Sequence, residues 1–268
     1  MQIPFKDKQI HVEVYGEGRP IVLLNGVMMV TKSWTPFVEA LSKNNKLILL
    51  DFLDQGQSSP AAESYNVETQ ADVVRAVLDG LKLENANISG ISYGSFVATQ
   101  FALSYPEKTE KLILFNCAAW CSPWLRDIGK SWDAAKGTPE GFYYAAMPII
   151  YSQGFYNNKQ EWLGTRKDLL TQYVFNDPEF FVSLNRRMES AHDHDVRARL
   201  GELKMKTLIV GSADDYLMPL FEQKYIHERV PNSDFVVMED CGHASMYEKP
   251  DVFTTLLTGF VNTESVKI

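Results

Sequence analysis

Residues 88–96 read ISGISYGSF and place the pattern Gly-x-Ser-x-Gly around Ser92. A turn that joins a strand directly to a helix forces its central serine into a strained backbone conformation, and side chains two residues away would collide with it. Gly90 and Gly94 remove both of those side chains. The pattern therefore predicts that Ser92 is a nucleophile at a sharp turn.

The residues on either side of this pattern fit a strand and a helix. Residues 86–91 are a short apolar run typical of a buried strand, and apolar side chains then recur at helical spacing from Phe96 to Leu103. The first N–H groups of that helix, and the positive end of its dipole, would lie beneath Ser92. Because both favour negative charge, the turn suits a reaction in which an oxyanion forms.

Similar apolar runs and helical patterns alternate along most of the chain. Continuous apolar runs are typical of strands buried on both faces. Strands alternating with helices predict an α/β fold, with a mostly parallel, doubly wound sheet covered by helices on both faces. Strands are expected at 11–15, 20–24, 46–51, 86–91, 111–115, 207–211 and 235–238, with a hairpin turn at 16–18, and helices at 36–41, 67–83, 96–103 and 251–261.

Residues 118–200 differ from the rest of the chain. They lack buried-strand runs and hold over a third of the aromatic residues in under a third of the length. We expect a core domain of residues 1–117 and 201–268, with residues 118–200 inserted as a helical lid. Most of these aromatics would pack the lid onto the core, and a few would line an apolar pocket at the strand carboxyl ends.

A nucleophilic serine needs a base, usually histidine, and an acid that orients it. His243 follows the strand at 235–238 through a short loop, which places it at the carboxyl end of a late strand beside Ser92. His11 and His227 are expected at the surface. The run His-Asp-His-Asp at 192–195 lies in a polar stretch that joins the lid to the core, and we do not expect it to bind a metal.

The acid should also lie on a loop after a strand. Asp214 and Asp215 both follow the strand at 207–211, and the chain order Ser, Asp, His is the one expected for this turn. We favour Asp214, while the other aspartate would be solvated or would cap the following helix. Asp240 is a weaker alternative because it lies only three residues from His243.

The composition narrows the classes of partner. A net charge of −8 and a pI near 5.2 argue against nucleic acid and anionic membranes as partners. Cys117, Cys121 and Cys241 are an odd number of cysteines, and residues 1–6 contain no apolar stretch typical of a signal peptide. We therefore expect a soluble cytoplasmic protein with free thiols, no metal and no cofactor, acting on a small molecule.

Taken together, these motifs resemble those of the α/β-hydrolase fold superfamily, over nearly all of the chain outside the lid. Two positions depart from its pattern: Asn25 stands where the family usually has histidine, and Asp54 replaces the first glycine of a conserved turn. The similar segments are 20–26 (the loop before the oxyanion hole), 51–58 (the Asp-x-x-Gly-x-Gly-x-Ser turn), 90–94, 211–219 (the Gly-x-x-Asp acid loop), and Gly242-His243 with Glu248 and Pro250.

The resemblance implies a serine hydrolase with Ser92, Asp214 and His243 as its triad, although the interval to Pro219 would suit Asp215. It also implies that the backbone N–H groups of Val27 and Tyr93 form the oxyanion hole. The expected reaction is hydrolysis of a carboxylic ester or thioester of a small, largely apolar substrate through an acyl-enzyme.

Two other functions remain alternatives. Leu24-Asn25-Gly26 and Gly211-Ser212-x-Asp214 are also similar to the acyltransferase of rhamnolipid synthesis, so the acyl group could pass to an alcohol or thiol. A ligand-binding or scaffold protein could keep the same fold without catalysis. The presence of a complete Ser, Asp and His set argues against this last alternative.

Overall fold

The computed structural model describes residues 1–264, and its centre is a sheet of eight strands. These are β1 (Gln2–Phe5), β2 (Lys8–Tyr15), β3 (Arg19–Leu24), β4 (Asn45–Leu50), β5 (Ala86–Ile91), β6 (Thr109–Phe115), β7 (Lys206–Ser212) and β8 (Ser233–Met238). The order across the sheet is β1-β2-β4-β3-β5-β6-β7-β8. All pairs from β4 to β8 are parallel, and β1 and β2 are antiparallel additions at one edge. The predicted mostly parallel sheet is confirmed.

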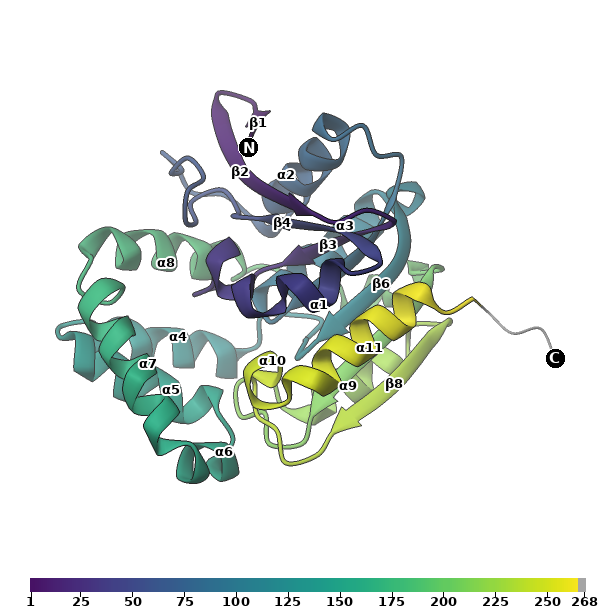
Figure 1. Ribbon diagram of the computed structural model, residues 1–268. Coiled ribbons are helices and arrows are strands. Elements are labelled where there is room, and N and C mark those ends of the chain that lie inside the picture. The colour runs from purple at the N-terminus through teal and green to yellow at the C-terminus, as the bar shows by residue number, and fades with distance from the viewer. Residues whose placement is uncertain (265–268) are drawn as a thin grey trace.

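Helices cover both faces of the sheet, as the apolar patterns predicted. Figure 1 shows α1 (Val38–Ser42) and α11 (Pro250–Asn262) in front of the sheet, with α2 (Val67–Gly80) and α3 (Tyr93–Ser104) behind it. The apolar residues of α2 and α3 share one core with α9 (Leu220–His227), and those of α1 and α11 belong to a second core. Short helical turns complete the described chain: η1 (Thr31–Phe37), η2 (Pro106–Lys108), η3 (Arg197–Glu202) and α10 (Ser245–Glu248).

The predicted hairpin between β2 and β3 is wrong. β2 pairs with β4 instead, with Val12 opposite Leu50, and forms its hairpin with β1. Gly16 and Gly18 have φ values of 68° and 115°, and a side chain at either would overlap the backbone just before β4. The two glycines therefore let the chain cross over the start of β4, and this leaves both sides of β3 free for parallel partners.

Five helices between β6 and β7 make up most of residues 118–200, which we call the insert. In Figure 1 they gather, teal to green, at one end of the sheet. Many of the aromatics pack within the insert: the Phe142 ring lies 4.7 Å from the Phe175 ring and 4.9 Å from the Phe181 ring. The helices are α4 (Pro123–Ala135), α5 (Pro139–Ile150), α6 (Gln153–Asn158), α7 (Gln160–Tyr173) and α8 (Pro178–Ser190). That the insert is a separate domain that acts as a lid stays a prediction.

Two further findings concern the described part of the chain. Within residues 1–264, the His, Cys, Asp and Glu side chains form no group of three or more suited to a metal ion. None of the helices in the same range has both the length and the apolar character that crossing a bilayer requires. His194, in the run that we considered as metal ligands, is buried, and its ring packs 4.9 Å from that of Phe96.

Burial of His194 predicts a loss of stability in acid. Burial lowers its pKa from 6.5 to about 4, so the unfolded chain binds a proton more readily than the folded chain does. The stabilisation is therefore complete above pH 6.5 and is lost as the pH falls toward 4, reaching a loss of about 2 kcal/mol at pH 5. Urea unfolding at pH 7 and pH 5 should show a smaller loss for His194→Leu than for the natural protein. Equal losses in the two proteins would contradict this.

Candidate active site

Ser92 lies at a sharp turn between β5 and α3, as the Gly-x-Ser-x-Gly pattern predicted. Its backbone has φ 56° and ψ −122°, a region that residues other than glycine rarely occupy. A side chain on Gly90 would overlap the carbonyl of Gly94, and one on Gly94 would overlap the carbonyl of Leu24. The two glycines therefore allow the turn to close and to approach the end of β3.

The structure pairs His243 with Asp215, and not with the favoured Asp214. His243 Nδ1 lies 2.8 Å from Asp215 Oδ2, and the Asp215 side chain is fully buried. The other oxygen, Oδ1, accepts the N–H groups of Leu217 (2.9 Å) and Met218 (2.8 Å). These two bonds turn the carboxylate inward from the loop after β7. Asp214 is only half-buried, and its N–H donates to the Cys241 carbonyl.

The remaining acidic and basic alternatives lie elsewhere. Asp240 is exposed and makes no hydrogen bond to His243. His11 bonds to Glu13 at 2.9 Å, and His227 bonds to Ser233 at 2.8 Å.

Asn116 is a member of this cluster that the sequence analysis missed. Its Nδ2 donates to Asp215 Oδ2 and to Ser212 Oγ, both at 2.9 Å, and its Oδ1 accepts from Ser245 Oγ at 2.6 Å. Asn116 has φ 48° and follows β6 directly. A buried polar side chain at the carboxyl end of a central strand is the signal that could have identified it.

The pairing with Asp215 determines which ring nitrogen of the imidazole is the donor. An ionised carboxylate only accepts hydrogen bonds, so Nδ1 is the donor, and in the neutral imidazole the lone pair is then on Nε2. Nε2 is buried and has no hydrogen-bond partner among residues 1–264. His243 and Ser92 line the same cavity. The structure therefore brings His243 and Ser92 to the lining of one cavity.

The loop after β3 also borders this space. A methyl group added to Gly26 would lie 3.7 Å from Ser92 Cβ, so the loop passes beside the serine. The Gly26 carbonyl accepts from Gln55 Nε2 (3.1 Å) and from the Met29 N–H (3.0 Å). In a planar trans peptide the carbonyl and the following N–H point in opposite directions. Gln55 and Met29 therefore direct the Val27 N–H away from themselves, and Tyr93, the first residue of α3, has an N–H without an intrahelical acceptor.

The two departures from the family pattern have structural explanations. Asn25 donates to Gln55 Oε1 at 2.9 Å and accepts from Trp34 Nε1 at 2.7 Å, so it fixes the glutamine that holds Gly26. Asp54 has φ 69°, a conformation that glycine adopts easily and aspartate tolerates. Its carboxylate accepts two hydrogen bonds from Arg186 of α8, each 2.6 Å long.

The insert is hydrogen-bonded to the loops that carry these residues. The Ile150 carbonyl accepts the N–H groups of His243 (2.8 Å) and Ala244 (3.2 Å). Glu248 accepts from the N–H and hydroxyl of Ser152, at 2.9 and 2.6 Å. Arg187 is buried, and its Nε donates to the Val27 carbonyl at 3.0 Å. The positions of both the histidine loop and the Val27 loop therefore depend on the insert.

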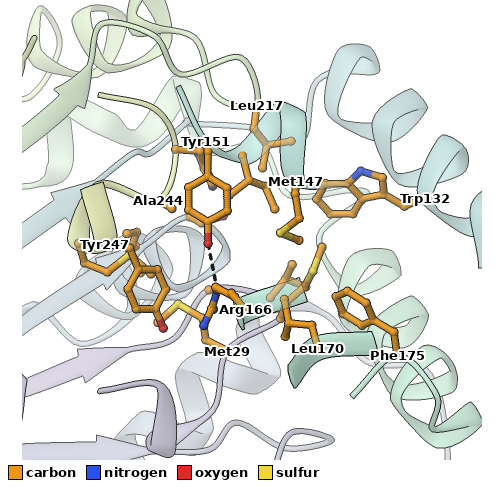
Figure 2. A pocket seen from close by; sticks show the side chains of 18 residues that line it. Met29, Trp132, Met147, Tyr151, Arg166, Leu170, Phe175, Leu217, Ala244 and Tyr247 are labelled. Carbon is orange, nitrogen blue, oxygen red and sulfur yellow. Dashed lines mark hydrogen bonds between the residues drawn. The ribbon is translucent and has the colours of Figure 1, made fainter. Parts of the chain in front are cut away.

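The cavity beside Ser92 is small and mostly apolar. We call it the inner cavity; its volume is about 90 Å³. Figure 2 shows Met147, Leu170, Phe175 and Leu217 around it, with Arg166 beside Tyr151. A second cavity of about 80 Å³ also includes Ser92, and the two have Val27, Ser92, Trp132 and Leu217 in common. Ser92 thus borders two apolar spaces.

The chain is similar to several known proteins over nearly its whole length. One is MGS-M2, an α/β hydrolase enzyme from a Medee basin deep-sea metagenome library, whose sequence is 41% identical to this one. Its crystal structure matches with a TM-score of 0.97, and the match covers 100% of this chain and 99% of that chain. A curated protein of Azorhizobium caulinodans, provisionally named carbamate hydrolase RutD, is 28% identical over 95% of each chain. A thermophilic esterase from Thermogutta terrifontis is 23% identical with a TM-score of 0.83, covering 98% of this chain and 99% of that one, and shows the fold alone.

The named relatives support hydrolase activity for this chain. The family model of the alpha/beta hydrolase fold matches residues 19–250, which include Ser92, Asp215 and His243. The chain therefore belongs to the α/β-hydrolase fold family.

Proposed function

We propose that this protein is a serine hydrolase that cleaves a carboxylic ester of a small, largely apolar substrate through an acyl-enzyme. One observation carries the proposal. His243 is bonded to a buried carboxylate through Nδ1, its Nε2 has no hydrogen-bond partner among residues 1–264, and His243 and Ser92 line the same cavity. A general base for a serine nucleophile needs an acid at one ring nitrogen and a free acceptor at the other, within reach of the serine.

In the first half of the reaction, His243 Nε2 takes the proton of Ser92 Oγ as the oxygen attacks the ester carbonyl. The N–H groups of Val27 and Tyr93 bind the oxyanion, and such donors each typically stabilise the transition state by about 3 kcal/mol. The imidazolium then gives its proton to the leaving alcohol. In the second half, His243 activates water, which attacks the acyl-enzyme and releases the acid.

Asp215 keeps the imidazole in the tautomer that this reaction needs and stabilises the imidazolium that forms. Asn116 and the N–H groups of Leu217 and Met218 hold the carboxylate in place. We propose Asp215, in place of Asp214, as the acid of the triad.

The two cavities beside Ser92 suggest how an ester would lie. With its carbonyl at Ser92, the acyl and alcohol parts would occupy one cavity each, and the apolar linings favour hydrocarbon groups. We propose that the insert acts as a lid, because Trp132, Met147 and Leu170 come from it and line the inner cavity.

Carbamate hydrolysis is a second candidate, favoured by the name of the relative from Azorhizobium caulinodans. The same acyl-enzyme chemistry applies to a carbamate carbonyl. Turnover of a phenyl carbamate, measured beside the phenyl ester of equal size, separates the two candidates.

Replacing the nucleophile tests the proposal. We expect Ser92→Ala to lower kcat for p-nitrophenyl butyrate by about 10⁴- to 10⁶-fold, because the acyl-enzyme can no longer form. The control is Ser95→Ala, which removes the neighbouring hydroxyl that bonds to the Ser92 carbonyl.

Analysis of products with an added alcohol distinguishes hydrolysis from acyl transfer. A loss of only a few fold in Ser92→Ala would exclude this serine as nucleophile.

A pair of substitutions tests which of the two aspartates is the acid of the triad. Asp215→Asn should lower kcat by roughly 10³- to 10⁴-fold. The Leu217 and Met218 N–H groups would bind the amide oxygen, so the NH₂ group would face His243 and impose the wrong tautomer. Asp214→Asn should change kcat by less than about threefold, since its side chain makes no bond to the imidazole. The reverse ranking would favour Asp214.

A further inference from the structure

We propose that Arg166 binds a carboxylate of the substrate, so that the preferred ester carries one free carboxylate in addition to its ester bond. This inference rests on the proposed function of the same site. It adds a single anionic group to a substrate whose remaining parts are apolar.

Arg166 belongs to α7 and lines both the inner cavity and a larger outer cleft that opens beside it. Its Nε donates to the Tyr151 hydroxyl at 3.1 Å, the contact drawn in Figure 2. Its guanidinium carbon also lies 4.5 Å from the centre of the Tyr247 ring. The centre of the Trp162 ring lies 5.5 Å from the same carbon. Three aromatic residues therefore contact the guanidinium, which lines both the cavity and the cleft.

Arg166 forms no ion pair with any Asp or Glu among residues 1–264. It contrasts with Arg186, whose guanidinium is paired with Asp54, and with Arg187, which donates to the Val27 and Asp54 carbonyls. The other side chains that line the inner cavity are apolar, aromatic or neutral polar groups, apart from the imidazole of His243. Arg166 is half-buried, and a cation in such surroundings favours an anion as its ligand.

The chemistry of guanidinium indicates which anion fits. The bond to Tyr151 uses Nε and leaves the two Nη groups, which form the planar fork that matches a carboxylate with two parallel hydrogen bonds. The contact with Tyr247 fixes the plane of that fork before a ligand arrives. An ester with a carboxylate at the far end of the group that fills the inner cavity would supply the missing anion.

Arg126 is the rival cation, since it lines the second cavity. Its Nε is buried without a partner among residues 1–264, and its side chain makes neither a hydrogen bond nor an aromatic contact there. The Arg166 guanidinium contacts three aromatic residues, whereas that of Arg126 contacts none within the described residues, so the Arg166 guanidinium is the one preorganised for a ligand.

Matched esters test the proposal. One series compares the monomethyl esters of succinate, glutarate and adipate with methyl 4-oxopentanoate, 5-oxohexanoate and 6-oxoheptanoate, in which a neutral acetyl group replaces the carboxylate. A second pair, 4-(butyryloxy)benzoate and 4-acetylphenyl butyrate, places the same difference on the leaving group. In at least one series we expect kcat/KM to be higher for the anionic ester by roughly 10- to 100-fold, the range of a charge-assisted hydrogen bond.

Arg166→Gln should abolish this preference, measured within the variant as the ratio of kcat/KM for the anionic ester to kcat/KM for its neutral partner, because the charge that binds the carboxylate is lost. Arg166→Lys should keep part of the preference for anionic esters, because the positive charge remains while the two parallel hydrogen bonds of the guanidinium are lost. Lys167→Gln removes a neighbouring cation that bonds to Tyr144 outside the cavity, and it should keep the full preference. A preference for the neutral esters in both series, or a preference removed by Arg126→Gln and not by Arg166→Gln, would overturn the proposal.

A binding measurement separates failure of this inference from failure of the proposed function. Calorimetric titration of the Ser92→Ala protein with glutarate needs no turnover. Binding that is lost when Arg166→Gln is added supports the carboxylate site even if no ester is hydrolysed. Equal binding to both proteins, or to neither, refutes the site even if Ser92 proves to be the nucleophile.

Discussion

The strained turn at Ser92 is the constraint on which the rest of the site depends. Its φ is 56°, and glycine is required at position 90 for the turn to close on residue 94 and at position 94 for the turn to approach the end of β3. The chain runs from β3 outward to β4 and returns across β3 to β5. In α/β sheets a crevice forms where the strand order reverses in this way, so Ser92 and Val27 come from the two strands that border it.

The loops around this crevice are held in place by hydrogen bonds from other parts of the chain. Gln55 donates a hydrogen bond to the Gly26 carbonyl, which belongs to the peptide before Val27. Arg187 of the insert donates to the Val27 carbonyl. The N–H groups of His243 and Ala244 donate hydrogen bonds to the Ile150 carbonyl. Glu248 accepts a hydrogen bond from the Ser152 N–H and so connects the histidine loop to the insert. Since these bonds use backbone groups or residues outside the cavity, the cavity lining can vary without loosening the loops. In the insert, the Ile150 carbonyl, Ser152 and Arg187 hold the loops, whereas the side chains of Met147 and Leu170 line the cavity.

Much of the sheet could be predicted from the sequence, because β3 to β7 are buried on both faces and read as continuous apolar runs. The order of the strands was harder. The predicted hairpin at residues 16–18 failed because a glycine turn permits a hairpin and a crossover equally, and only the pairing of β2 with β4 decides between them.

The sequence could predict which loops carry the candidate site residues, but it could not predict which side chains on those loops are hydrogen-bonded to one another. Ser92 and His243 were expected from motifs and their order; the structure places both in the lining of one cavity, and their catalytic roles stay a prediction. The choice between Asp214 and Asp215 depends on which carboxylate turns inward to the N–H groups of Leu217 and Met218, a matter of loop conformation. Asn116 lies 99 residues from Asp215 along the chain, so only the folded sheet brings the two together. Arg166 on the insert had no motif around it that could have marked it.

The most direct test is a crystal structure of the protein after reaction with a small alkyl fluorophosphonate, which mimics the tetrahedral intermediate. The account predicts one covalent bond, from phosphorus to Ser92 Oγ, with a phosphonyl oxygen about 3 Å from the N–H groups of both Val27 and Tyr93. It also predicts His243 Nε2 within hydrogen-bond distance of Ser92 Oγ or of the phosphonate. Failure of the reagent to modify Ser92, or an oxygen that points away from both N–H groups, would contradict it.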